Sequence, residues 1–256
     1  MPVTADDAAS AIVRQLASLC KAFPGAWVRQ ENGVAALYTG LPAPMFNGVI
    51  AERNDADADF AKRILDEFAE AGVPYNVSVR SSDYVAFIEL AKERGLTQAR
   101  TVPLMVLESP SGDEPLPKGL SIRKLVPDES EKSAEIAAAC FEMPVEIARQ
   151  MTRQEVLELD GLRCYLGEFD GRPVATSLGI TSAGVVGIFN VATLKQARGR
   201  GFGRALTVRA IAEGVAGGAT WAYLQSSAAG FSIYRALGFE TVEEWSEYLP
   251  AQPDAS

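Results

Sequence analysis

The stretch that most constrains the fold runs from Val185 to Leu206, where an apolar run leads into a segment rich in glycine and arginine. The apolar run contains Val, Ile, Phe and Thr, which predicts a strand. The letters R-G-R-G-F-G at 198–203 then open a helix, with apolar residues near helical spacing at Leu206, Ile211 and Val215. Glycines at a helix start let the backbone approach a ligand, and the unpaired amides there attract an anion. We therefore expect a strand, a phosphate-binding loop and a helix.

Three arginines, Arg198, Arg200 and Arg204, add fixed positive charge beside these amides, which suits a pyrophosphate. The spacing argues against two other phosphate motifs. A dinucleotide fingerprint needs G-x-G-x-x-G, and Arg204 or Leu206 stands where its third glycine would fall. No Gly-Lys-Ser/Thr tripeptide follows a glycine loop either. A nucleotide-binding α/β domain that reads ATP or NAD is therefore the least favoured alternative.

The remaining pattern, Arg198-x-x-Gly201-x-Gly203, resembles the R/Q-x-x-G-x-G/A signature of the GCN5-related N-acetyltransferases (GNAT). Downstream, Y-R-A-L-G-F at 234–239 resembles the Y-x-x-L-G-F ending of the second acyl-CoA motif of that family. The resemblance covers roughly residues 119–249. It implies the GNAT acyl-CoA N-acyltransferase fold, an α/β fold with a mixed, largely antiparallel central sheet and flanking helices, here in tandem.

A segment rich in Pro, Gly and charge separates two strand-like runs between Ser109 and Gly119, which predicts a linker. We expect four parts along the chain. They are a degenerate GNAT-like half without an acyl-CoA motif at 1–110, the linker at 111–118, a catalytic GNAT domain at 119–250 and a flexible tail at 251–256. Within the second half we expect a strand, helices at 130–143 and 144–159, three strands, and then two further helix–strand pairs.

The first half repeats the second faintly and at a constant offset. Phe46 and Gly95 match Phe189 and Gly238, each 143 residues further on. Shared order at one offset suggests an internal duplication, with chance similarity of two α/β segments as the alternative. In place of the glycine loop, the first half has Asp55, Asp57 and Asp59. These carboxylates would repel a pyrophosphate, so we expect the first half to bind no coenzyme A and Asp59 to be a helix N-cap.

The resemblance implies acetyl-CoA as the cosubstrate, with main-chain groups of the motif strand beside the pantetheine arm and the thioester carbonyl near the amide of Val191. Phe189, Val191 and Thr193 alternate along that strand and are expected to share a face. The glycine-loop amides and the arginines would hold the pyrophosphate, and two serines would bond the pantetheine or Tyr234. The expected binding residues are Asn190, Val191, Ala192, Thr193, Arg198, Gly199, Arg200, Gly201, Phe202, Gly203, Arg204, Ser226, Ser227, Phe231 and Tyr234.

Tyr234 is the expected catalytic acid for the leaving thiolate, because family members with a tyrosine at this place use it so and a phenol is protonated at neutral pH. A core aromatic side chain is the alternative. The general base is open, since the chain has no histidine and the motif strand, unlike that of several family members, has no carboxylate. Glu168 is one candidate base, with Glu146 or a water chain as alternatives. We expect no metal site.

Charge and composition narrow the partners. The net charge of −9 and a pI of about 4.8 argue against binding to nucleic acid. No apolar run is long enough to span a membrane, and the acidic Asp6 and Asp7 argue against a signal peptide. The three widely spaced cysteines suit a reducing, cytoplasmic setting and give no metal-ligand spacing.

The leading function is transfer of an acetyl group from acetyl-CoA to a primary amine of an unidentified small-molecule or peptide acceptor. The alternative is a non-catalytic sensor or structural module that binds acyl-CoA. Glutamates between Ser130 and Leu159 favour a cationic acceptor. A monomer is favoured over a homodimer, because a duplicated chain can do within one molecule what single-domain relatives do as dimers.

Overall fold

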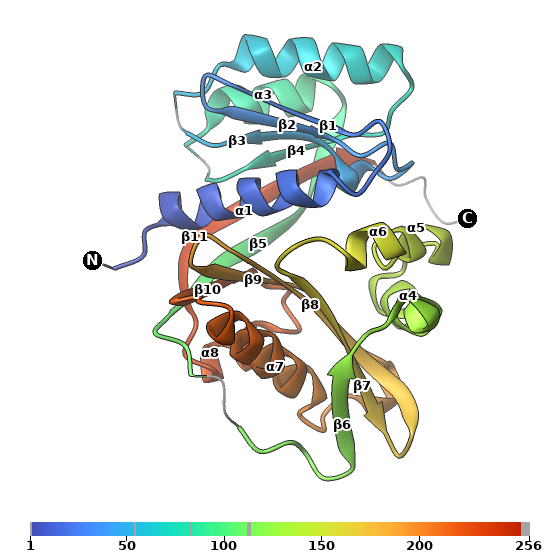
Figure 1. Ribbon diagram of the computed structural model, residues 1–256. Coiled ribbons are helices and arrows are strands. Elements are labelled where there is room, and N and C mark those ends of the chain that lie inside the picture. The colour runs from blue at the N-terminus through green and yellow to red at the C-terminus, as the bar shows by residue number, and fades with distance from the viewer. Residues whose placement is uncertain (1, 54, 82, 112–113, 252–256) are drawn as a thin grey trace. The chain divides into compact units, whose positions relative to one another are not determined.

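The chain divides into two compact units (Figure 1). The structure is a computed structural model that describes residues 2–53, 55–81, 83–111 and 114–251. The first unit contains Thr4–Leu104 and the chain from Thr241, and the second contains Met105–Glu240 with Pro2 and Val3. This division differs from the expected domains: the boundary falls before the linker, and the last strand belongs to the first unit. Of the expected tail, only Ala251 lies within the described residues.

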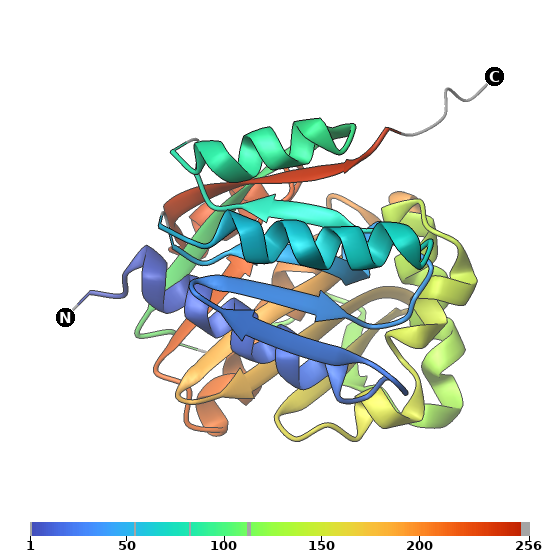
Figure 2. The same cartoon turned by 90° about the horizontal axis from the view of Figure 1, so that it is seen from above.

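The first unit is a mixed sheet with helices on both faces (Figure 1). Its neighbouring strands are antiparallel, except that β3 and β4 are parallel. Helix α1 (Ala5–Cys20) covers one face, and α2 (Ala58–Glu70) and α3 (Val85–Glu93) cover the other. Figure 2 shows β11 in red beside β4. The strand order is β1 (Trp27–Glu31), β2 (Val34–Tyr38), β3 (Asn47–Ala51), β4 (Asn76–Val79) and β11 (Glu240–Pro250).

Helical spacing of apolar residues explains how α2 packs. Phe60, Ile64 and Phe68 recur at intervals of four and are buried against the sheet, while the lysine, arginine and acidic residues between them face water. These side chains join a core cluster that also holds Val49 and Val77 of the parallel strand pair. The first unit therefore has a hydrophobic core of its own.

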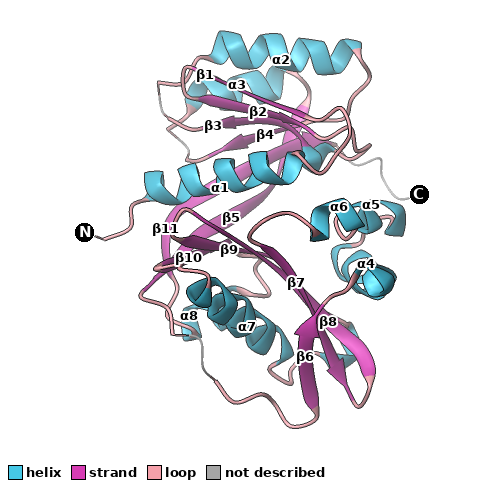
Figure 3. Cartoon of the chain, in the orientation of Figure 1, coloured by secondary structure: helices cyan, strands magenta, loops and turns pink. Residues whose placement is uncertain are grey.

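The second unit is also a mixed, largely antiparallel sheet between two helical layers (Figure 3). Helix α7 (Phe202–Ala216) lies on one face, and α4 (Ser130–Phe141), α5 (Val145–Gln150) and α6 (Gln154–Leu157) lie on the other. Of β5 (Leu96–Glu108), the part from Met105 on belongs to this unit. The strand order is β5, β10 (Trp221–Gln225), β9 (Val185–Thr193), β8 (Arg172–Ser182), β7 (Leu162–Phe169) and β6 (Leu120–Lys124), and α8 (Phe231–Ala236) follows β10. The predicted fold class is confirmed.

The helix expected over 144–159 is instead two short helices, α5 and α6. The chain turns between them, where the Thr152 hydroxyl lies within hydrogen-bond distance of the carbonyls of Arg149 and Ser130. A threonine that bonds back to the preceding backbone in this way competes with continued helix. Short 3₁₀ turns at Pro44–Phe46, Pro127–Glu129 and Lys195–Ala197 complete the secondary structure of the described residues.

The two halves of the chain repeat one order of elements: β3, α2, β4, α3 and β5 in the first half, and β9, α7, β10, α8 and β11 in the second. Helix α2 begins at Ala58 and α7 begins at Phe202, 144 residues later. The offset of 143 expected from the sequence is thus one residue short at these helices. With the structural offset, Asp57 corresponds to Gly201, and each stands immediately before its helix.

Candidate active site

Strand β9 contains a β-bulge in the middle of the segment expected to hold the donor. The register with β8 shifts between Thr176 and Leu178, and Asn190 has a left-handed φ of 52°. Asn190 and Val191 therefore stand together opposite Ser177. A bulge leaves its extra residue outside the regular ladder, so backbone groups at Asn190 and Val191 are freed from the usual pairing.

The bulge also reverses the alternation of side chains along β9. Phe189 packs edge-on against Tyr223, with ring centroids 5.9 Å apart. Val191, by contrast, packs against the core cluster under α7, together with Ile188. The expectation that Phe189 shares a face with Val191 and Thr193 is therefore wrong, because one extra residue shifts the period-two pattern.

Strand β9 is paired with β10 only over its first half, although nearly all of β10 takes part in the pairing. The parallel register joins Val185–Ile188 to Trp221–Leu224. The last five residues of β9, Phe189–Thr193, extend beyond this paired segment. This leaves the β10-facing edge of 189–193 as a strand edge to which an extended ligand can add main-chain hydrogen bonds.

Helix α7 begins without a side-chain cap. Gly201 is the N-cap residue, with a φ of 79° that favours glycine, and no side chain bonds the first amides. These amides and the helix dipole give the site its affinity for an anion. Arg198 folds back over the loop, where its Nε donates to the carbonyl oxygen of Thr193 at 3.0 Å. This hydrogen bond ties the loop before α7 to the end of β9.

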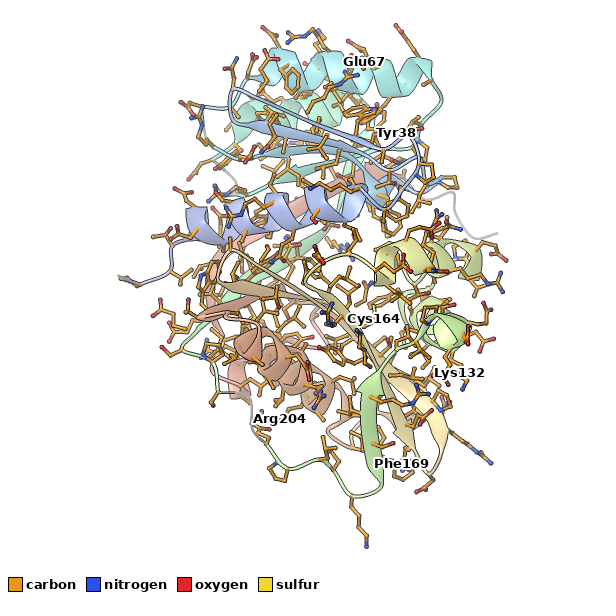
Figure 4. All side chains as sticks on the ribbon, in the orientation of Figure 1. Tyr38, Glu67, Lys132, Cys164, Phe169 and Arg204 are labelled. Atoms are coloured by element: carbon orange, nitrogen blue, oxygen red, sulfur yellow. The ribbon has the colours of Figure 1, made fainter. Side chains whose placement is uncertain are left out.

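The other two arginines are held by neighbours that the sequence did not reveal. The guanidinium of Arg200 lies 4.8 Å from the ring centre of Phe169, which packs on Phe202 at 5.3 Å. Arg204 donates to both carboxylate oxygens of Glu114, at 2.8 and 2.5 Å, and this bond lowers the pKa of Glu114. Figure 4 labels Phe169 and Arg204. Charge alone could not predict that Glu114, far away in the sequence, would pair with Arg204.

Tyr234 lies in the core between α8 and α7, with 9 % of its surface exposed. Its phenol is hydrogen-bonded to Thr207, and burial raises the pKa of Tyr234. The Thr207 hydroxyl in turn donates to the carbonyl of Gly203 at 2.9 Å. This chain connects the expected acid to the first turn of α7. Thr207 was not among the expected residues, although its position four residues after Gly203 is a usual one for a side chain that bonds the helix backbone.

Ser226 and Ser227 are engaged in the turn between β10 and α8. The buried Ser226 hydroxyl donates to the carbonyl of Ser227 at 2.8 Å, and the Ser227 hydroxyl accepts from the amide of Gly230 at 3.3 Å. Both serines therefore shape the start of α8, beside the partly buried Phe231.

Glu168, the expected base, is not brought to the bulge. It lies on β7, which is separated from β9 by β8, and its carboxylate accepts from Arg123 at 2.9 Å. Glu146 is exposed and lies 3.5 Å from Arg149. Both glutamates thus balance an arginine charge, and neither stands beside the freed backbone of Asn190.

Burial raises the pKa of the Cys20 thiol to about 11 and that of the Cys164 thiol to about 12, so neither of these two cysteines offers a reactive thiolate at neutral pH. Among the described residues, no group of three or more histidine, cysteine, aspartate or glutamate side chains is placed to hold a metal ion. In the part of the chain that the structure describes, none of the helices has the length and apolar character needed to cross a membrane.

Comparison with known proteins shows which family this part of the chain is similar to. Residues 138–230 match the family model of the acetyltransferase (GNAT) domain. The resemblance to GCN5-related N-acetyltransferases predicted from the motifs is thereby confirmed, and it indicates acyl transfer to an amine as the general class of activity. No curated protein matches the chain.

Solved structures share the fold along nearly the whole chain. A GCN5-related N-acetyltransferase from Kribbella flavida is 20% identical, with a TM-score of 0.72, and the match covers 98% of this chain and 97% of that one. A GCN5-related N-acetyltransferase from Sphaerobacter thermophilus is 17% identical, with a TM-score of 0.58 and coverage of 96% and 93%. A tandem GNAT protein from the clavulanic acid biosynthesis pathway is 15% identical, with a TM-score of 0.57 and coverage of 99% of both chains. At these identities the likeness concerns the fold.

Proposed function

We propose that the chain transfers an acetyl group from acetyl-CoA to a primary amine, with the donor held by the second unit alone. One observation carries this proposal: two sets of unpaired backbone groups follow each other along the chain. They are the bulged edge of β9 at 189–193 and the uncapped start of α7 at Gly201. The first suits an extended pantetheine arm, and the second suits a pyrophosphate. Arg198 and Arg200 supply the countercharge.

The proposed chemistry has to overcome two problems. An amine with a lysine-like pKa of about 10.4 is mostly protonated at pH 7, and its deprotonation costs roughly 4–5 kcal/mol. The thiolate must also receive a proton as it leaves. We assign the second task to Tyr234, whose buried phenol remains protonated, and we assign stabilisation of the thioester oxygen to the freed amide of Val191.

We assign removal of the amine's proton to bound water. Glu168 and Glu146 are paired with arginines, and residues 185–194 contain no carboxylate. The acceptor itself is proposed only as a class, a small-molecule or peptide amine. The free cysteines fit the cytoplasmic setting that we propose for the reaction.

The test is calorimetric titration of the wild type and the Arg198→Glu variant with acetyl-CoA, coenzyme A and NAD. We expect one site per chain for acetyl-CoA and coenzyme A, loss of both in the variant, and no binding of NAD. Failure of the wild type to bind acetyl-CoA would remove the proposal. Two sites per chain would instead contradict a silent first unit.

The lack of a carboxylate at the bulge favours one second candidate, a non-catalytic sensor that binds acyl-CoA. A panel of amines separates the two. Release of coenzyme A that depends on an amine supports the transferase, and tight binding without release for every amine supports the sensor.

A further inference from the structure

The segment Glu114–Pro117, which we call the strap, lies along the first turns of α7. Together with Gly201, Arg204, Ala205 and Val208 it lines a pocket of about 250 Å³. Pro117 of the strap lies close to Gly201, since its Cγ is 3.6 Å from where a Cβ on Gly201 would stand. The strap therefore borders the loop to which we assign the pyrophosphate.

Glu114 occupies two hydrogen-bond donors of the Arg204 guanidinium. Its two oxygens accept from Nε and Nη2, the paired geometry in which a guanidinium also holds a phosphate. A carboxylate and a phosphate cannot both occupy the same two donors. While Glu114 is in place, its carboxylate neutralises the charge of Arg204 beside the loop to which we assign the pyrophosphate.

We propose that the strap is a gate on the donor loop, closed by the Glu114–Arg204 pair and opened when a phosphate group of the donor displaces Glu114. This inference rests on the proposed function. It adds that the protein binds its donor more weakly than the loop alone would, because some of the binding free energy is used to break an internal ion pair.

The structure of the strap fits a segment that can leave. Its residues line one side of a pocket, and Leu116 at its centre is half exposed. Side chains of the pair are themselves about one-third exposed, 33% for Arg204 and 39% for Glu114. Pro115 and Pro117 keep the segment extended and remove two backbone donors, so little secondary structure is lost when it moves.

The test is the affinity for coenzyme A of wild type, Glu114→Gln and Glu213→Gln, measured by calorimetry at low salt. Glu213 is the matched control, because it pairs with Arg209 at 2.6 Å on the same helix and its substitution changes the net charge equally. We expect Glu114→Gln to bind coenzyme A about two- to fivefold more tightly, the range of an exposed ion pair, and Glu213→Gln to bind as the wild type does.

Repeating the comparison in the Arg204→Gln background identifies the cause. There we expect Glu114→Gln to bring no gain, because the pair is already broken. As a second measurement, trypsin should cleave after Lys118 faster when coenzyme A is present. Equal or weaker binding by Glu114→Gln, with wild-type binding intact, overturns the gate while leaving the proposed function. Absence of binding in every protein overturns both.

Discussion

The strand before the crossover helix ends differently in the two units. In the first unit, β3 pairs with β4 through its last residue, Ala51, and in the second unit β9 leaves β10 after Ile188 and continues for five more residues. A Cβ on Gly48 would lie only 2.2 Å from the carbonyl oxygen of Asn76, so the backbones of β3 and β4 are in close contact. The edge that is available in the second unit is thus closed in the first.

The two helix starts differ in the same sense. Asp57 caps α2 and accepts hydrogen bonds from the amides of Asp59 and Phe60, while Gly201 leaves the start of α7 uncapped. Asn47, near the matching point of β3, is buried and bonded to the carbonyls of Leu41, Ala43 and Pro74. The first unit therefore satisfies internally the groups that the second leaves for a ligand. One arrangement of elements serves as a scaffold in one case and as a binding site in the other.

The largest effect expected from this comparison concerns the stability of the scaffold. Arg80 is 4% exposed and is bonded to Glu243 at 2.9 Å, to Asp6 at 2.7 Å and to the carbonyl of Glu52. We expect Arg80→Ala to lower the free energy of unfolding by about 3–5 kcal/mol, because it leaves the largely buried carboxylate of Glu243 without its cation. Urea denaturation followed by tryptophan fluorescence measures this.

The matched control for Arg80 is Arg63→Ala, since Arg63 pairs with Glu31 at 3.6 Å and both side chains are at least half exposed. This change should cost less than about 1 kcal/mol. A similar loss of unfolding free energy in the two variants would show that the buried ion pairs of Arg80 stabilise the first unit no more than an exposed ion pair does.

The next effect transfers the closed helix start to the second unit. We expect Gly201→Asp to weaken coenzyme A binding by on the order of 100-fold. The new carboxylate would cap the first amides of α7, as Asp57 caps those of α2, and would repel the pyrophosphate. Gly201→Asn has nearly the same shape without the charge, and both residues tolerate a positive φ better than most. Calorimetry should show a smaller loss for Gly201→Asn, and equal losses would point to shape instead of charge.

A third prediction concerns the proposed acid, Tyr234, which has no counterpart in the first unit. Helix α3 corresponds to α8, and it carries the apolar Leu90 and Ala91 at the positions that match Tyr234. We expect Tyr234→Phe to lower kcat by on the order of 100-fold with little change in KM for acetyl-CoA. Burial raises the pKa of Tyr234 above its usual 10, so the acid should stay protonated and kcat should not fall for lack of it below about pH 10.

Tyr165→Phe is the control for Tyr234→Phe, since Tyr165 is equally a buried tyrosine of the second unit and has no proposed role in the reaction. Its kcat should match that of the wild type. Unchanged turnover in Tyr234→Phe at saturating acetyl-CoA would leave Tyr234 as a core residue only.

The sequence predicts the parts of this comparison that depend on local pattern. Glycines and arginines at 198–203 mark the loop, and the aspartates of the first half mark a closed counterpart. It does not predict the bulge at Asn190, because a bulge depends on register against β8, nor the Glu114–Arg204 pair, because the partners are 90 residues apart. The sequence also predicts Asp59 as the N-cap of α2, whereas the structure has Asp57 in this role. Either aspartate side chain can cap a helix, so residue type alone does not distinguish them.

The smallest effect tests whether the cap alone keeps the first unit closed. We expect Asp57→Ala to lower Tm modestly at pH 7 and to leave one coenzyme A site per chain, because β3 and β4 remain paired. Hydrogen bonds to the helix amides lower the pKa of Asp57 from 3.8, so its stabilisation is present above that pH and is lost as the pH falls through the lower, folded value. The Tm difference should therefore shrink in acid.

Asp55→Ala is the matched control for the cap, because Asp55 lies in the same loop and contacts only the exposed Arg53, at 3.2 Å, among the ion pairs of the described residues. Its Tm should equal that of the wild type at both pH values. If Asp57→Ala created a second coenzyme A site, the carboxylate at the helix start would be the element that silences the first unit, and the paired strands would not. One site per chain in both variants would assign that role to the closed β3–β4 edge, which a single substitution cannot open.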